Sequence, residues 1–183
     1  METSDPDATQ RLVIALGDPA GIGMEVTLKA LASPELPKAM KPVLVGCRRT
    51  LLETHDRLLR LGCTSMADPE HLTIVDRPLT DPLQPGQGDD RSGEASFHWL
   101  TVAVDQLVTG GARALVTAPI AKHLWHAAGH IYPGQTERLA ELAGCRQASM
   151  LFTARSPLSG WRLNTLLATT HIPLQQVPVL LNE

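Results

Sequence analysis

Apolar runs alternate with amphipathic segments along most of the chain. Apolar runs of strand length lie at residues 12–16, 42–46, 72–75 and 114–119. Segments with leucine, valine or alanine at helical spacing lie at residues 24–31, 50–61 and 93–108. Buried parallel strands read as continuous apolar runs, and helices form the crossovers between them. The alternation therefore predicts an α/β domain with layers and a mostly parallel sheet.

The remaining predicted elements are short. Short helices are expected at residues 121–128 and 134–142, and two further strands at 149–154 and 163–169. Proline, glycine and aspartate crowd residues 77–93, which predicts a long surface loop. Residues 1–10 are polar and acidic and are expected to be a disordered lead-in. The apolar end of the chain lacks a cap, which suggests a sequence that is cut short.

Composition narrows the class of protein. The net charge of −3 and an aromatic content of 3% give no basic stripe or stacking platform, so we expect no nucleic-acid partner. No apolar run is long enough for a bilayer, so we expect no membrane partner. Three widely spaced cysteines form neither a disulfide framework nor a zinc motif. The simplest interpretation is a cytoplasmic protein.

A glycine-rich loop, Gly17-Asp18-Pro19-Ala20-Gly21-Ile22-Gly23, joins the first strand to the first helix. It either brings the backbone close to a phosphate or nucleotide, or makes a tight turn that binds nothing. It matches neither Gly-x-Gly-x-x-Gly nor a lysine-containing phosphate loop, so neither of those mechanisms transfers to it.

Two later stretches carry polar groups where elements begin or end. Lys122 follows the strand at 114–119 and either holds an anion or is a solvated helix residue. Gln135 and Thr136 open the helix at 134–142, where their side chains either contact a phosphorylated substrate or belong to the helix's first turn.

His171 follows the apolar run at 163–169, and ligands of open α/β sheets bind beyond the carboxyl ends of strands. It either ligates a divalent ion or exchanges a proton, or it caps the next turn. The histidines at 123, 126 and 130 have helical spacing, which a solvated face explains better than a metal site.

Four stretches occur here in an order that resembles a known family. They are Gly17-Asp18-Pro19-Ala20-Gly21-Ile22-Gly23, Val116-Thr117-Ala118-Pro119-Ile120-Ala121-Lys122, Gly134-Gln135-Thr136-Glu137 and Ala168-Thr169-Thr170-His171-Ile172-Pro173-Leu174. They resemble the amino-terminal half of the 4-hydroxythreonine-4-phosphate dehydrogenases of pyridoxal phosphate biosynthesis. The first stretch also resembles the loop of the isocitrate and isopropylmalate dehydrogenases. The resemblance implies a three-layer α/β/α fold of that type and a homodimer, with residues 11–183 as the amino-terminal part of a two-lobed subunit.

The resemblance also implies a chemistry. The family oxidises a phosphorylated hydroxy amino acid with NAD, and the β-keto acid then loses carbon dioxide. Three histidines would hold a divalent metal that polarises the substrate oxygens. His171 matches the first of these ligands, and zinc, magnesium, cobalt or manganese suits such a site. Gln135 and Thr136 match the substrate-binding pair, which in many members is His-Thr. The resemblance gives no catalytic residue and leaves the NAD-binding residues unknown.

The departures from the family leave three readings. Glutamine at 135 keeps hydrogen bonding but cannot become cationic, which leaves open a sister dehydrogenase for threonate or erythronate 4-phosphate. The family's other two metal histidines lie beyond the end of this sequence, so we expect residues 1–183 alone to be inactive or nearly so. The third reading is a non-catalytic, truncated module for binding or dimerisation.

Overall fold

A computed structural model describes residues 11–109, 111–145, 148–169 and 172–181. The expected lead-in at 1–10 lies outside these described residues. The chain divides into two compact units, Met1–Ala143 and Gly144–Glu183, and each is described separately.

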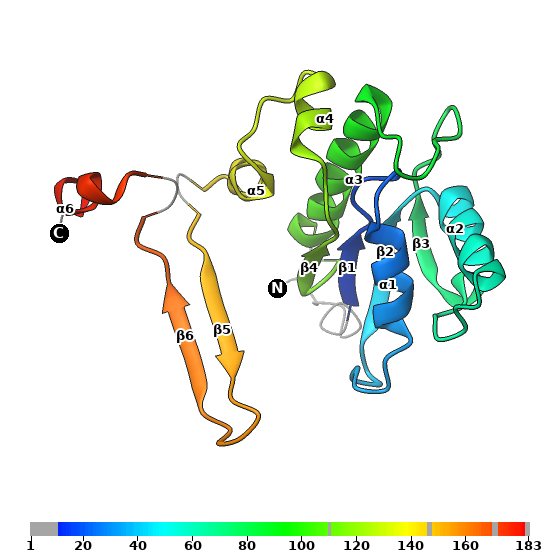
Figure 1. Cartoon of the computed structure of the whole chain (residues 1–183), viewed down its shortest axis with the longest axis horizontal. Helices are drawn as coiled ribbons and strands as arrows, with labels where there is room; N and C mark the ends of the chain where they lie inside the picture. The colour runs from blue at the N-terminus through cyan, green and yellow to red at the C-terminus, as the bar shows by residue number, and fades with distance from the viewer. Residues whose placement is uncertain (1–10, 110, 146–147, 170–171, 182–183) are drawn as a thin grey trace, which may run out of the picture. The chain divides into compact units, whose positions relative to one another are not determined.

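A four-stranded parallel sheet organises the first unit (Figure 1). Its strands are β1 (Arg11–Ala15), β2 (Lys41–Gly46), β3 (Thr73–Asp76) and β4 (Ala114–Thr117), in the order β3-β2-β1-β4. In register, Ile14 of β1 pairs with Leu44 of β2 and with Val116 of β4. Because the strands are parallel, their carboxyl ends meet at one edge of the sheet, where ligands bind in open α/β sheets.

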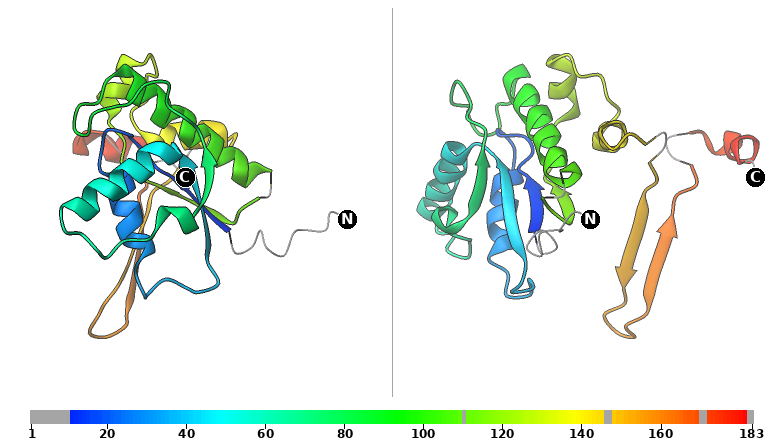
Figure 2. Two further views of the ribbon diagram at one scale, coloured as in Figure 1. Left: turned by 90° about the vertical axis from the view of Figure 1, so that its right-hand side faces the viewer. Right: turned by 180° about the vertical axis from the view of Figure 1, so that it is seen from behind.

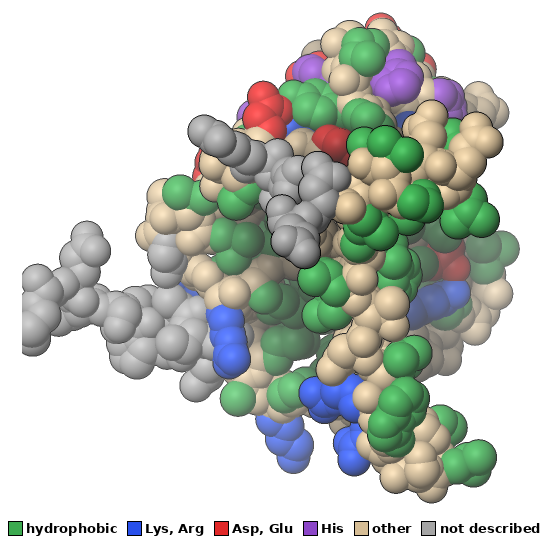
Figure 3. Space-filling view, turned by 90° about the vertical axis from the view of Figure 1, so that its left-hand side faces the viewer, with side chains coloured by type: hydrophobic (Ala, Val, Ile, Leu, Met, Phe, Trp, Pro, Cys, Tyr) green, Lys and Arg blue, Asp and Glu red, His purple; other side chains and the backbone are tan. Residues whose placement is uncertain are grey.

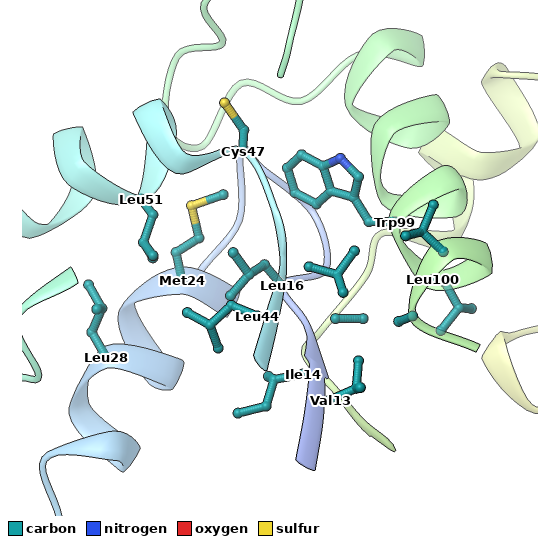
Figure 4. Close-up of a cluster of buried hydrophobic side chains, with 14 of the residues drawn as sticks. Val13, Ile14, Leu16, Met24, Leu28, Leu44, Cys47, Leu51, Trp99 and Leu100 are labelled. Atoms are coloured by element: carbon teal, nitrogen blue, oxygen red, sulfur yellow. The ribbon is translucent and has the colours of Figure 1, made fainter. Parts of the chain in front are cut away.

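Helices cover both faces of this sheet. Those bounding it are α1 (Gly23–Leu31), α2 (Arg48–Arg60) and α3 (Asp90–Val108), and a short 3-10 helix η2 (Pro69–His71) precedes β3. Figure 2 shows α1 and α2 on one face and α3 on the other. Figure 4 shows Met24 and Leu28 of α1 on one side of the strands, and Trp99 and Leu100 of α3 on the opposite side. All four are buried. The expected α/β/α layering is confirmed.

α3 begins earlier than the apolar spacing alone predicts. Asp89 accepts a hydrogen bond from Ser92 N at 3.2 Å, and Ser92 Oγ accepts one from Asp89 N at 3.1 Å. This reciprocal capping box satisfies two backbone donors at the helix start. It sets the first helical residue at Asp90, so the preceding loop ends at Asp89.

Two short helices follow β4. α4 (Lys122–Ala127) is fixed on α3 by Trp125, which is fully buried and donates from Nε1 to Ser96 Oγ at 2.8 Å. α5 (Gln135–Leu142) has no buried residue, although Leu139 packs partly against the core. Both helices lie close to their predicted positions.

The second unit contains a β-hairpin. Its strands, β5 (Leu151–Arg155) and β6 (Arg162–Leu166), pair antiparallel, and all ten residues are exposed. β6 ends at Leu166, short of the predicted 169. A 3-10 turn η3 (Leu174–Gln176) and the helix α6 (Val177–Leu180) follow. Figure 3 shows hydrophobic side chains on one face of the molecular surface. In the second unit, Phe152, Trp161 and Leu163 are exposed.

No helix among the described residues has both the length and the apolar content that crossing a membrane requires.

Candidate functional site

The glycine-rich loop is held in shape by its own aspartate. Asp18 is only 8% exposed, and its Oδ1 accepts a hydrogen bond from Ala20 N at 2.9 Å. Its carbonyl oxygen accepts a second from Gly21 N at 3.0 Å. An aspartate that bonds the backbone two residues ahead forms an Asx turn. The carboxylate therefore serves the loop itself and leaves Gly21 and Ile22 exposed at its outer surface.

The loop lies directly against the end of β4. Asp18 N donates to Pro119 O at 3.0 Å, and Ala118 N donates to Ala15 O at 2.9 Å. Gly17 has a φ of +71°, and a Cβ placed on it would lie 2.3 Å from Pro119 O. Only glycine fits both this backbone conformation and this approach. The glycine-rich loop and the stretch that follows β4 thus pack against each other at the carboxyl edge of the sheet.

The long loop at 77–89 also reaches this edge. Gly86 N donates to Ala20 O at 2.7 Å. A cavity of about 630 Å³ opens between this loop and α3, lined by Leu79, His98 and Trp99 among others. Neither Gln135 nor Thr136 lines that cavity.

Gln135 attaches the third stretch to the second. Its Nε2 donates to Ala118 O at 3.3 Å, which places the first turn of α5 beside the loop that follows β4. Each carboxamide has two N–H donors and one acceptor oxygen. One donor and Oε1 are thus left over, because Gln135 makes no other side-chain hydrogen bond within the described part of the chain.

Lys122 and Thr136 lie at the same turn. A Cβ placed on Gly134, the residue before α5, would lie 3.4 Å from Lys122 Nζ. The ammonium group therefore approaches the start of a helix, where backbone N–H groups carry partial positive charge. Among the described residues, neither Lys122 nor Thr136 has a side-chain hydrogen bond or ion pair. Glu137 Oε2 lies 3.5 Å from the same point, so a carboxylate of the first turn also faces the ammonium group.

A smaller apolar groove adjoins this turn. It has a volume of about 250 Å³, lies between α1 and β4, and includes Thr117, Ala118 and Pro119 in its lining. The carbonyl that Gln135 bonds thus belongs to a residue shared by the groove and the polar turn.

The predicted metal ligand, His171, cannot be placed relative to the other site residues. His171 lies outside the described residues. Those residues contain no group of three His, Cys, Asp or Glu side chains that could hold a metal ion. His126 instead bonds Tyr132 O at 3.0 Å, and His130 bonds Glu94 at 2.7 Å. The described residues therefore do not by themselves fit a divalent-metal site.

Sequence reasoning missed Arg138, one turn beyond Gln135. Its guanidinium bonds Glu141 on its own helix at 2.8 Å and Thr101 on α3 at 3.2 Å. The Tyr132 hydroxyl and then Arg138 bond the Glu141 carboxylate, and together they lower the pKa of Glu141. Phe97 and Thr101 lie four residues apart and therefore on one face of α3. This spacing was the sequence feature that could have indicated a surface for another helix to contact.

The layered fold and the polar turn at the carboxyl edge of a parallel sheet define an α/β protein with a candidate ligand site at that edge. The model of one family, described as pyridoxal phosphate biosynthetic protein PdxA, matches residues 38–183. The chain belongs to this family.

Three comparisons illustrate the relationship. A 4-hydroxythreonine-4-phosphate dehydrogenase of Synechococcus sp. (strain RCC307) is 60% identical over 171 residues, covering 93% of this chain and 51% of the relative. A D-threonate 4-phosphate dehydrogenase of Pectobacterium atrosepticum is 34% identical, covering 94% of this chain and 54% of the relative. A solved structure of a putative 4-hydroxythreonine-4-phosphate dehydrogenase from Salmonella typhimurium has a TM-score of 0.78 and 30% identity, covering 94% of this chain and 55% of that one. The chain spans about half the length of the relatives it matches.

Proposed function

We propose that this chain contributes the amino-terminal part of an NAD-dependent 4-hydroxythreonine-4-phosphate dehydrogenase. The reaction transfers a hydride from the hydroxyl-bearing carbon of 4-phosphooxy-threonine to NAD, and the hydroxyl proton leaves. The resulting β-keto acid loses carbon dioxide and gives 3-amino-2-oxopropyl phosphate, an intermediate of pyridoxal phosphate biosynthesis. One observation carries the proposal: Gln135, Thr136 and Lys122 meet at one turn beside the glycine-rich loop.

In this proposal the turn binds the substrate. The Thr136 hydroxyl and the second Nε2 hydrogen of Gln135 donate to substrate oxygens, while the Lys122 ammonium acts as a point charge for the phosphate. The bond from Gln135 to Ala118 O fixes the carboxamide before the substrate arrives. Preorganised donors bind an anion without a further cost in side-chain ordering.

The cofactors belong to the proposal as well. NAD is the hydride acceptor, and His171 is proposed as one ligand of a divalent metal such as zinc, magnesium, cobalt or manganese. A metal site of this kind needs about three protein ligands, and the described residues do not supply the others. A homodimer and a cytoplasmic location complete the proposal.

A sister activity is the second candidate. The Pectobacterium relative is named D-threonate 4-phosphate dehydrogenase. Gln135 stays neutral at every pH, so it cannot give the positive charge that a histidine supplies when protonated. Threonate or erythronate 4-phosphate is therefore the competing substrate. A non-catalytic binding or dimerisation module is the third candidate.

A substrate panel distinguishes the three candidates. The protein is expressed from its reading frame with any in-frame continuation past Glu183, and NADH formation is followed with 4-phosphooxy-threonine, threonate 4-phosphate and erythronate 4-phosphate. The proposal predicts the highest kcat/KM for 4-phosphooxy-threonine. A preference for either sugar-acid phosphate would establish the sister activity. If none of the three substrates gives NADH, the non-catalytic module becomes the favoured candidate. Residues 1–183 alone are expected to give no turnover.

A further inference from the structure

α5 carries the proposed substrate residues but is weakly anchored. It has only eight residues, none of them is buried, and no side chain caps its start at Gly134. Isolated helices of this length are marginal in water, so tertiary contacts must hold it. Gln135 and Thr136 are its first two residues. Whatever fixes α5 therefore also fixes the position of the substrate-binding turn.

Arg138 provides such a contact from the middle of the helix. Its Nη2 donates to Thr101 Oγ1 of α3 at 3.2 Å, and its Nη1 donates to the Tyr132 hydroxyl at 3.4 Å. The guanidinium carbon lies 4.6 Å from the centre of the Phe97 ring, also on α3. One planar group thus joins α5, the preceding loop and α3.

The α3 side of this contact is rigid. Thr101 Oγ1 donates to Phe97 O at 3.1 Å, which orients its lone pairs for the guanidinium. α3 is anchored to the sheet by Trp99 and Leu100, each 1% exposed. Through its contacts with α3, Arg138 therefore connects α5 to the hydrophobic core of the first unit.

Burying the Arg138 side chain carries a free-energy penalty. Only 14% of its side chain is exposed, and its buried Nε has no hydrogen-bond partner among the residues that the structure describes. Leaving a charged donor unpaired away from water is unfavourable. Apolar packing alone would not require an arginine at this position, whereas a two-sided link between helices uses its forked geometry.

We propose that Arg138 is a positioning residue, which sets the place of Gln135 and Thr136 without touching the substrate. The proposal rests on the proposed function, since it assigns the turn a phosphorylated substrate. Arg138 acts together with the bond from Gln135 to Ala118 O, which holds the other end of the same turn. Losing Arg138 leaves α5 held by that bond, by the hydrogen bond from Tyr132 to Glu141 and by the partial packing of Leu139, so the turn is less firmly fixed.

Steady-state kinetics of the protein from the whole reading frame test this role. Arg138→Met keeps the apolar stem and removes every donor. It is expected to raise the KM for 4-phosphooxy-threonine about tenfold, with kcat and the KM for NAD within about twofold, as loss of uniform substrate binding predicts. Arg138→Lys keeps the charge near Phe97 and should recover part of the loss. The matched control is Arg60→Met at the exposed end of α2, with all constants unchanged.

A second substitution approaches the link from α3. Thr101→Val removes the accepting hydroxyl at nearly constant volume, at a residue remote from the substrate turn. It should raise the same KM in the same direction. An unchanged substrate KM in both Arg138→Lys and Thr101→Val would overturn the proposal, even if Arg138→Met fails to fold. So would equal rises in the KM for NAD and for substrate.

Hydrogen exchange separates this proposal from the function on which it rests. Thr101→Val should speed exchange of the α5 amides and leave those of α3 unchanged. If the wild-type protein oxidises none of the phosphorylated substrates, the proposed function fails. The contact between Arg138 and Thr101 is then tested by hydrogen exchange alone. Unchanged α5 exchange would then overturn the positioning role, and faster exchange confined to α5 would support it.

Discussion

Replacing Gly17 with alanine tests how closely the glycine-rich loop must approach β4. Gly17 has a φ of +71°, and an added Cβ would lie 2.3 Å from Pro119 O and 3.0 Å from Ala118 C and O. All these atoms are backbone and cannot rotate away. The substitution must either distort the loop or displace the strand end that bonds Gln135.

The expected loss has two parts. A left-handed conformation costs an alanine about 1–2 kcal/mol, and overpacking costs about 1–3 kcal/mol more, so we expect about 3 kcal/mol in total. Gly62 is a matched control within the same unit. Its φ is +84°, but no atom lies within 4 Å of an added Cβ. Gly62→Ala should therefore lose only the conformational part, about 1–2 kcal/mol.

Urea unfolding followed by tryptophan fluorescence measures both losses. Trp99 and Trp125 are 1% and 0% exposed, so their emission reports on the core of this unit. The slope of the free energy against urea should stay constant, and the midpoint should fall much further for Gly17→Ala. Equal losses for the two variants would refute the idea that close backbone approach, rather than φ alone, requires glycine at 17.

Three further substitutions test local contacts. Trp125→Phe removes the buried bond to Ser96 and should cost about 1–3 kcal/mol in urea unfolding. Asp89→Ala removes the cap of α3 and should cost about 1 kcal/mol in the same assay. The lowered pKa of Glu141 means that its stabilisation is complete above the ordinary value of 4.5 and is lost as the pH falls through the lower folded pKa. Glu141→Gln should flatten this acidic part of the stability profile, measured by urea unfolding across pH.

The alternation of apolar runs was sufficient to predict the sheet. All four strands of the first unit lie at or within a few residues of their predicted positions, and their pairing is parallel. The reason is burial on both faces, which leaves an unbroken apolar run in sequence. The start of α3 was harder to locate, because Asp89 caps it through a polar side chain that carries no hydrophobic period.

The site could be predicted only in part. Gln135 and Thr136 were identified from their polar groups at a predicted helix start and from the resemblance. The bond from Gln135 to Ala118 O joins stretches that are 17 residues apart in sequence. Arg138 was missed because its partner, Thr101, lies 37 residues away on another helix. Side-chain pairs across elements depend on packing angles that sequence spacing does not encode.

The most direct test of the proposed function compares NADH formation from 4-phosphooxy-threonine and from unphosphorylated 4-hydroxythreonine, in the wild type and in Thr136→Val. The protein is again expressed with any in-frame continuation of its gene. We predict a strong wild-type preference for the phosphorylated substrate and a lower kcat/KM for it in Thr136→Val. Equal rates with the two substrates, or a variant indistinguishable from the wild type, would contradict a phosphate-binding turn at the start of α5.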